Sequence, residues 1–144
     1  MKIYVLGSNA FVYQMVESKN KLCELGHEGW IHPHYEDFVR GEREFDRHVL
    51  TTGERAAAKR DNDYLRVHFR NIGESDAVLI VNLEKNGSKN YIGGNALIEM
   101  GQAYVLGKKI YLLTEIPSDA PYVDEIEAMD PICLHGDLSN INKQ

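Results

Sequence analysis

The sequence predicts one α/β domain built on a doubly wound, five-stranded parallel sheet with the strand order 2-1-3-4-5. Short apolar runs alternate with longer stretches of helical periodicity, which is typical of βαβ units. The run 77–81, Ala-Val-Leu-Ile-Val, is apolar at every position, which favours a central strand covered on both faces. The chain has 144 residues and no repeat, low-complexity tract or linker. A single domain over residues 1–144 therefore accounts for the whole sequence.

The first elements follow from where the apolar runs stop. Residues 3–6 are apolar and lead into Gly7-Ser8-Asn9, which predicts a strand and a turn. Residues 11–25 place apolar side chains at helical spacing and are followed by a glycine, as helices often are. Residues 27–32 predict the second strand, which a proline then ends.

The middle of the chain is its most polar part. Residues 34–60 are rich in Glu, Arg and Asp, which predicts a surface excursion with some helix. Residues 62–74 predict the helix that leads into the central strand.

The remaining elements continue the alternation. After a polar loop, the stretch 92–95 opens a helix that ends at Leu106 before a glycine. Residues 109–113 predict the fourth strand, 122–129 a short helix and 132–134 the fifth strand.

This topology also predicts where a ligand binds. Doubly wound sheets bind ligands beyond the carboxyl ends of their strands, where the strand order reverses. Here those ends are the loops 7–9 and 82–95. A helix begins after each loop, so its free backbone N–H groups and positive dipole end favour an anion.

Composition limits the kind of partner. The chain carries 22 Asp plus Glu against 16 Lys plus Arg, a net charge of −6. This excess is spread along the chain, whereas binding of a nucleic-acid polymer or an anionic membrane needs a concentrated basic surface. We therefore expect a small-molecule partner.

The cysteines and the N-terminus favour a cytoplasmic protein. Cys23 and Cys133 form no CxxC pair and indicate neither a zinc site nor a redox dithiol; we expect both to be buried free thiols. The first apolar run is too short for a signal peptide, and no run has transmembrane length.

The sequence lacks the motifs for several common functions of this architecture. It contains neither GxGxxG nor GxxxxGK[ST], which argues against the standard dinucleotide turn and a P-loop. A phosphoacceptor domain needs acids after its first and third strands, where this chain has Gly7 and Asn82. Binding of a flavin by an electron carrier stays open.

Glu99 is the most informative polar residue. A carboxylate in an otherwise apolar helix facing the expected ligand edge suits a nucleophile or a general base. The alternative interpretation is that Glu99 has no chemical role and is present because the positive dipole end at a helix N-terminus favours an acidic side chain. However, Ala96 stands where a capping box has Ser or Thr, and Gly94 and Gly101 flank the glutamate as if a ligand or backbone comes close.

The segment 93–103 resembles the nucleophile helix of the nucleoside 2-deoxyribosyltransferase superfamily. That helix has a glycine-containing turn followed by Glu-x-Gly-x-Ala, which Glu99-Met100-Gly101-Gln102-Ala103 matches. The strand and loop 3–8 and the pair Ser75-Asp76 before the central strand are also similar to the family. The resemblance covers most of the chain outside the polar excursion.

The resemblance implies cleavage of the N-glycosidic bond of a deoxynucleoside or its 5′-monophosphate. The sugar is held covalently on the glutamate and passes to water in a hydrolase or to a second base in a transferase. It implies Glu99 as nucleophile, Tyr4 as a residue that orients it and Asp76 as an acid near the substrate. It implies no metal and no cofactor, and a homodimer or larger homo-oligomer. The candidate substrate-binding residues of the two loops are Gly7, Ser8, Asn9, Gly93, Gly94 and Asn95.

Two departures from the family pattern matter. Gly93 stands where transferases of the family carry an aspartate, and the preceding helix has no acid where His68 lies. Both positions lack the carboxylate of the family, whereas the glycines of the loop are present. This favours a phosphorylated ligand, because the N–H groups of Gly93 and Gly94 suit an anion. The alternative function is a nucleotide-binding or sensing module without turnover.

Weaker signals accompany these. Lys85 and Lys89 either contact phosphate or are solvated. His32-Pro33-His34 resembles half a metal site, but no third ligand follows at a suitable spacing.

Overall fold

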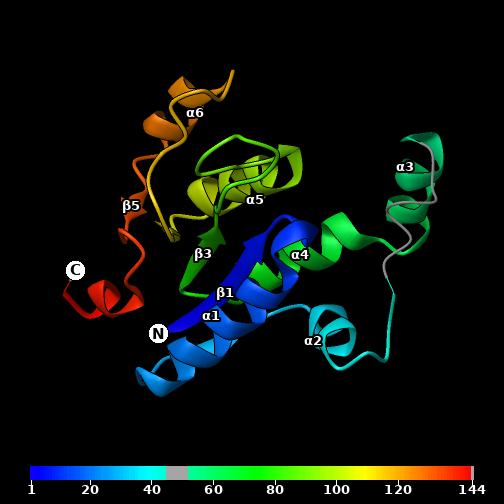
Figure 1. Ribbon diagram of the computed structural model, residues 1–144, viewed down its shortest axis with the longest axis horizontal. Coiled ribbons are helices and arrows are strands. Elements are labelled where there is room, and N and C mark those ends of the chain that lie inside the picture. The colour runs from blue at the N-terminus through cyan, green and yellow to red at the C-terminus, as the bar shows by residue number, and fades with distance from the viewer. Residues whose placement is uncertain (45–51, 144) are drawn as a thin grey trace.

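In the computed structural model of the protein, the residues described are 1–44 and 52–143 (Figure 1). Its sheet has five parallel strands in the order β2-β1-β3-β4-β5, which confirms the predicted fold class. The strands are β1 Lys2–Gly7, β2 Glu28–Trp30, β3 Ala77–Val81, β4 Lys109–Leu112 and β5 Ile132–Cys133.

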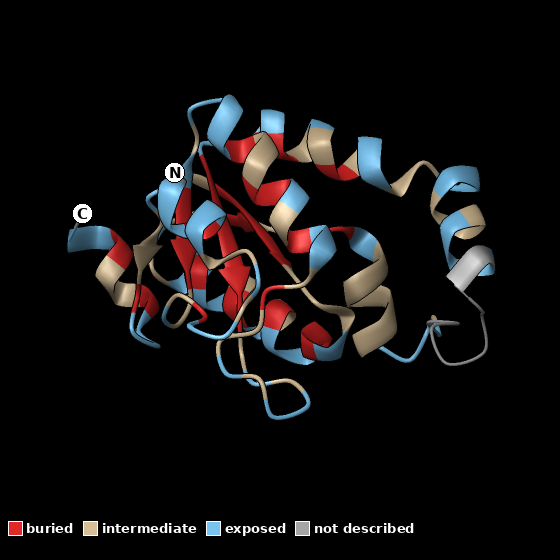
Figure 2. Cartoon of the chain, turned by 90° about the horizontal axis from the view of Figure 1, so that it is seen from above, coloured by how far each residue is buried: buried red, intermediate tan, exposed pale blue. Residues whose placement is uncertain are grey.

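Helices cover both faces of this sheet. They are α1 Val12–Glu24, α2 Pro33–Val39, α3 Thr52–Asp61, α4 Tyr64–Gly73, α5 Gly94–Val105 and α6 Val123–Ala128, with the short 3₁₀ helices η1 Asn9–Phe11 and η3 Leu138–Lys143. Figure 2 shows that the buried residues lie in the strands and along the inward sides of these helices.

Successive side chains of β1 point to opposite faces of the sheet, so the core consists of two clusters, one on each face. Ile3 and Val5 pack on the face covered by α1 and η3, while Tyr4 and Leu6 pack on the face covered by α4, α5 and α6. All five residues of β3 are buried, as expected for the central strand. Tyr4 is therefore on the same face as Glu99, which α5 carries.

The polar excursion contains two helices, in line with the expectation of some helix. Pro33 occupies the first turn of α2, so the second strand ends earlier than expected. The expected helix over 62–74 begins two residues later, because Asp63 adopts a left-handed conformation with φ 52° that separates α3 from α4. Residues 45–51 of the excursion lie outside the described residues. Figure 1 shows α3 beyond the sheet layers, next to α4.

The expectation that both cysteines are buried is wrong. Cys23 is exposed and Cys133 is half-buried, and both are free thiols. In α1 the buried positions include Met15, Ser18 and Leu22, so Cys23 is turned away from the core. Apolar neighbours in the sequence therefore did not predict the face on which this side chain lies.

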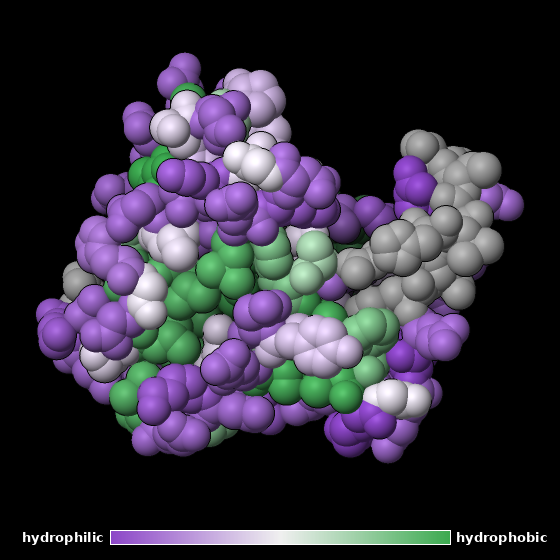
Figure 3. All heavy atoms as spheres, viewed as in Figure 1, coloured by the Kyte–Doolittle hydropathy of each residue, from purple (hydrophilic) through white to green (hydrophobic). Residues whose placement is uncertain are grey.

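An apolar surface remains beside α1. The last described element on this face is the short η3, and a shallow hollow next to it is lined by Val16, Leu83, Leu113 and Leu138. Figure 3 shows apolar side chains gathered between α1 and the C-terminal segment. Within residues 1–44 and 52–143, no helix combines the length and apolar character needed to cross a membrane.

The close packing of β2 on α1 predicts a stability effect at Gly29. A Cβ at Gly29 would lie 2.6 Å from the Lys19 carbonyl oxygen and 2.9 Å from Leu22 Cβ. We expect Gly29→Ala to lower the free energy of unfolding by about 1–3 kcal/mol. The control is Gly101→Ala in α5, where nothing lies within 4 Å, and a gain of about 0.5–1 kcal/mol is expected there. Urea unfolding of both variants tests this, and equal stability of the two would contradict it.

Candidate functional site

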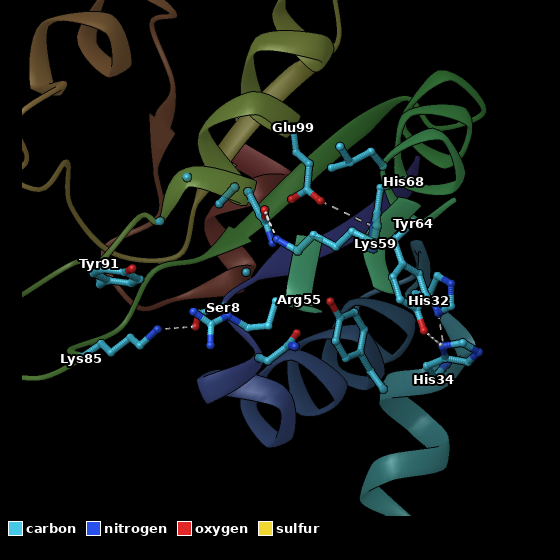
Figure 4. A pocket seen from close by; sticks show the side chains of 18 residues that line it. Ser8, His32, His34, Arg55, Lys59, Tyr64, His68, Lys85, Tyr91 and Glu99 are labelled. Carbon is cyan, nitrogen blue, oxygen red and sulfur yellow. Dashed lines mark hydrogen bonds and ion pairs between the residues drawn. The ribbon is translucent and has the colours of Figure 1, made fainter. Parts of the chain in front are cut away.

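A cavity of about 540 Å³ opens at the carboxyl ends of β1 and β3, the edge that the topology indicates (Figure 4). Its walls come from the loop after β1, the start of α2, the helices α3, α4 and α5, and the loop after β3. The lining residues used below are Gly7, Ser8, Asn9, His32, His34, Tyr35, Arg55, Lys59, Tyr64, His68, Lys85, Tyr91, Gly93, Gly94, Asn95 and Glu99.

Glu99 projects into this cavity from the inward side of α5. It shares that side with Ala96, Met100 and Ala103, and only 5% of the residue is exposed. His68 is a close neighbour, with its Nδ1 3.7 Å from Glu99 Oε1. This distance exceeds that of a hydrogen bond. The carboxyl group is thus buried and has no hydrogen bond to another described residue.

Burial controls the ionisation of Glu99. Removal from water raises its pKa to about 8, and the positive charge of Lys59 opposes this shift. At neutral pH, Glu99 therefore mostly holds its proton. A further nearby cation or a higher pH favours the carboxylate, the form that attacks an electrophile.

Tyr4 lies behind the cavity rather than on its wall. Its fully buried hydroxyl is 2.9 Å from His68 Nδ1 and accepts a hydrogen bond of 3.1 Å from Asn71 Nδ2. Burial raises the pKa of Tyr4, and the negative charge of Glu99 adds to this. Tyr4 thus keeps its proton and hydrogen-bonds to His68, and its expected role in orienting Glu99 stays a prediction.

One side of the cavity is built from imidazole and phenol rings, which we call the aromatic wall: His32, His34, Tyr35, Tyr64 and His68. The His32 ring lies 4.4 Å from the His34 ring and 5.4 Å from the His68 ring, measured between centroids. The Tyr64 ring lies 6.0 Å from the His32 ring. Such a wall offers π faces for stacking with a planar ligand.

Basic side chains line other parts of the cavity, and we call Arg55, Lys59 and Lys85 the cationic group. Lys59 Nζ donates to Asn95 Oδ1 at 2.9 Å, which ties α3 to the start of α5. Lys85 Nζ donates to Ser8 Oγ at 3.1 Å and so joins the loops after β3 and β1. Figure 4 shows Lys85 and Ser8 on one side of the cavity and the three histidines on the other.

The glycines of the two loops admit close packing. Gly7 lies against β3, where an added Cβ would be 2.9 Å from the Val81 carbonyl oxygen. A Cβ on Gly93 would lie 2.9 Å from the Tyr91 hydroxyl, whereas a Cβ on Gly94 would meet no atom of another part of the chain within 4 Å. The start of α5 is therefore open to a ligand at Gly94.

The structure places seven of the nine expected site residues on the cavity wall, Tyr4 behind that wall and Asp76 away from it. Those that line the cavity are Gly7, Ser8, Asn9, Gly93, Gly94, Asn95 and Glu99. Asp76 is different, because it precedes β3 and so lies at the amino end of the sheet, where its Oδ2 accepts a hydrogen bond of 2.7 Å from the Lys2 backbone N–H. The structure does not bring Asp76 to the cavity, and the expected role near the substrate does not fit this position.

Sequence reasoning missed Tyr35 and Tyr64 of the aromatic wall and two members of the cationic group. Arg55 and Lys59 belong to the polar excursion, for which the sequence predicts no role. The spacing of these residues in the sequence could have indicated that they lie together. Arg55 and Lys59 are four residues apart in α3, and Tyr64 and His68 are four residues apart in α4, so each pair shares one helix face.

Metal binding has no structural support in the described residues. Within residues 1–44 and 52–143, no three His, Cys, Asp or Glu side chains are grouped to hold a metal ion. His32 instead accepts a hydrogen bond at Nδ1 from the His34 backbone N–H.

Comparison of the chain with known protein families, with curated proteins and with solved structures finds no match. The resemblance to the deoxyribosyltransferase superfamily therefore stays a prediction.

Proposed function

We propose that this protein cleaves the N-glycosidic bond of a nucleoside or, preferably, a nucleoside 5′-monophosphate, with Glu99 as the nucleophile. The observation that carries this proposal is the buried carboxyl group of Glu99. It faces a cavity with an aromatic wall and a cationic group, and it forms no hydrogen bond to any described residue. A planar base suits the aromatic wall, and an anionic group suits the cations.

The chemistry requires an ionised carboxylate. An Oε atom of Glu99 attacks C1′ of the sugar, and the C1′–N bond breaks with its electron pair leaving on the base. The sugar then forms an ester with Glu99. Water, or a second base, attacks C1′ and releases the carboxylate, which gives a hydrolase or a transferase.

The cationic group supports a phosphorylated substrate. Lys85 contacts Ser8, and Lys59 contacts Asn95 at the start of α5. Together with the N–H groups of α5 near Gly94, these side chains offer charge and donors to a phosphate. The net charge of −6 does not oppose this, because the local charge of the cavity decides anion binding.

The direct test is base release. The protein is incubated with deoxynucleosides and their 5′-monophosphates, and free base is measured by chromatography. A 2′-deoxy-2′-fluoro substrate analogue should slow release of the sugar and leave a glycosyl adduct on the peptide that contains Glu99, seen by mass spectrometry. Absence of free base from every substrate would overturn the proposal.

The pH dependence of turnover follows from the ionisation of Glu99. Because burial raises its pKa to about 8 and Lys59 opposes this, kcat/KM should rise with pH and level off above about pH 8. Lys59→Met should move this rise to higher pH. The control is Lys89→Met, since Lys89 is exposed on the loop after β3 and does not line the cavity. An identical pH profile in both variants would contradict the role of Lys59.

One observation favours a second candidate, a nucleotide-binding module without turnover. With a pKa of about 8, Glu99 is mostly protonated at neutral pH, and a protonated carboxyl group is a poor nucleophile. This candidate predicts that a nucleoside monophosphate raises the melting temperature while no base is released at any pH between 6 and 9.5.

We also propose that the protein is a homo-oligomer. Leu65 of α4 and Ile98 and Val105 of α5 are exposed apolar residues on adjacent helices, which supports a contact between copies. Light scattering after size exclusion should give a mass above 16.4 kDa. The cytoplasmic location stays a prediction from the sequence.

A further inference from the structure

The protonation of His32 is set by its own backbone. The Nδ1 atom of His32 accepts a hydrogen bond of 3.2 Å from the backbone N–H of His34. A backbone N–H can only donate, so Nδ1 carries no proton and the neutral ring is protonated at Nε2. Burial lowers the pKa of His32 to about 4, and nearby positive charge adds to this, so the ring is neutral at pH 7.

The protonation of His68 follows from the hydrogen bonds around Tyr4. Asn71 Nδ2 donates to the Tyr4 hydroxyl, whose own proton has one acceptor among the described residues, His68 Nδ1. If His68 donated instead, the buried hydroxyl proton of Tyr4 would have no acceptor, which is costly. His68 is thus also protonated at Nε2, and burial lowers its pKa to about 4, so this ring is neutral too.

The Nε2–H groups of both rings lack a hydrogen-bond partner among the described residues, and both residues line the cavity. Neither Nε2 atom is among the fully buried polar atoms that lack a partner. The two rings line the cavity with centroids 5.4 Å apart and planes 33° apart, and Figure 4 shows them on the same side of it. The aromatic wall therefore holds two neighbouring uncharged rings, each with an N–H donor that no described residue uses.

We propose that His32 and His68 read the base through these two N–H groups and select bases that present oxo groups over bases that present amino groups. This inference rests on the proposed function. An oxo group accepts a hydrogen bond from such a wall, whereas an amino group would face the wall with N–H against N–H and leave buried donors unpaired.

The same donors assist the departure of the base. When the C1′–N bond breaks, the base carries away the electron pair, and in an oxo base the negative charge spreads onto the oxygens. Preorganised N–H groups aimed at this charge stabilise the transition state. The released anion then takes a proton from water, so His32 and His68 stay neutral throughout. Uracil and hypoxanthine nucleotides belong to the favoured class, and cytosine and adenine nucleotides to the disfavoured class.

The test compares substrates that differ in one group. Values of kcat/KM are measured for dUMP against dCMP and for dIMP against dAMP, and we expect the oxo member of each pair to be favoured by at least about tenfold. The variants His68→Phe and His32→Phe remove one donor each and should bring both ratios toward one. His68→Gln retains an N–H donor and should restore part of the preference. Each ratio is taken within one variant, so a general loss of activity cancels.

The outcomes separate this inference from the proposed function. If base is released but the oxo and amino substrates react equally, or if both ratios survive loss of His32 and His68, the inference is overturned and the glycosidase stands. If no base is released, the proposed function fails. Selectivity is then measured as the dissociation constants of the same four nucleotides by calorimetry, where equal values overturn the inference and tighter oxo members support it.

Discussion

Glu99→Gln should abolish base release and make the protein more stable at alkaline pH. An amide cannot form the glycosyl ester, so we expect kcat to fall by roughly 10³-fold or more. The folded-state pKa of Glu99 is raised from 4.5 to about 8, so the unfolded chain loses its proton at lower pH than the folded protein. The cost to the native state is absent below pH 4.5 and grows as the pH rises to about 8. Above that pH it is of the order of 3–5 kcal/mol.

Removing the carboxylate removes this cost. The free energy of unfolding of Glu99→Gln, from urea titrations, should equal that of the wild type at pH 4.5 and exceed it at pH 8.5. Glu127→Gln is the control, because Glu127 is exposed on α6 and lies outside the cavity. Retained base release would exclude Glu99 as nucleophile. An unchanged stability at pH 8.5 would show that Glu99 ionises without penalty.

Stability should pass through a maximum near pH 6.5 as a result of three buried groups. His32 and His68 have folded-state pKa values lowered from 6.5 to about 4. Their neutral forms stabilise the native state fully above pH 6.5, and this contribution is lost as the pH falls toward 4, by up to about 3 kcal/mol for each ring. Glu99 has the opposite effect, because its ionisation in a buried site lowers the stability of the native state increasingly as the pH rises to about 8.

Unfolding by urea between pH 4 and 9 measures this curve. His68→Gln should flatten its acid side and Glu99→Gln its alkaline side, because each removes one titrating group. His135→Gln is the control for the acid side, since the His135 side chain is 67% exposed and lies outside the cavity. An acid side as steep in His68→Gln as in the wild type would contradict the assignment of a buried neutral ring.

The elements could be predicted because their signals are local. The apolar run of β3 and the apolar spacing of α1 depend on neighbours in the chain, and both were placed to within one or two residues. The start of α4 was missed because Asp63 carries no pattern that distinguishes a left-handed residue from a helical one. The expected role of Asp76 does not fit for a different reason. Its place before β3 puts it at the amino end of the sheet, but the role came from similarity to a family motif, which carries no such position.

Glu99 was found from the sequence because its motif is contained within one helix. The sequence by itself also determined the sheet order and the two loops at which a ligand would bind, since alternating apolar runs and right-handed crossovers leave few arrangements. None of this required knowledge of which distant residues meet.

The walls of the cavity were decided by the tertiary structure alone. Lys85 meets Ser8 across 77 positions and Lys59 meets Asn95 across 36, and no local pattern encodes such pairs. The ionisation of Glu99, His32 and His68 depends on burial, which exists only after α3, α4 and α5 have packed around the end of the sheet. Glu99 could be identified from the sequence, but its charge is set only in the folded chain, because desolvation depends on all the atoms that surround the carboxyl group.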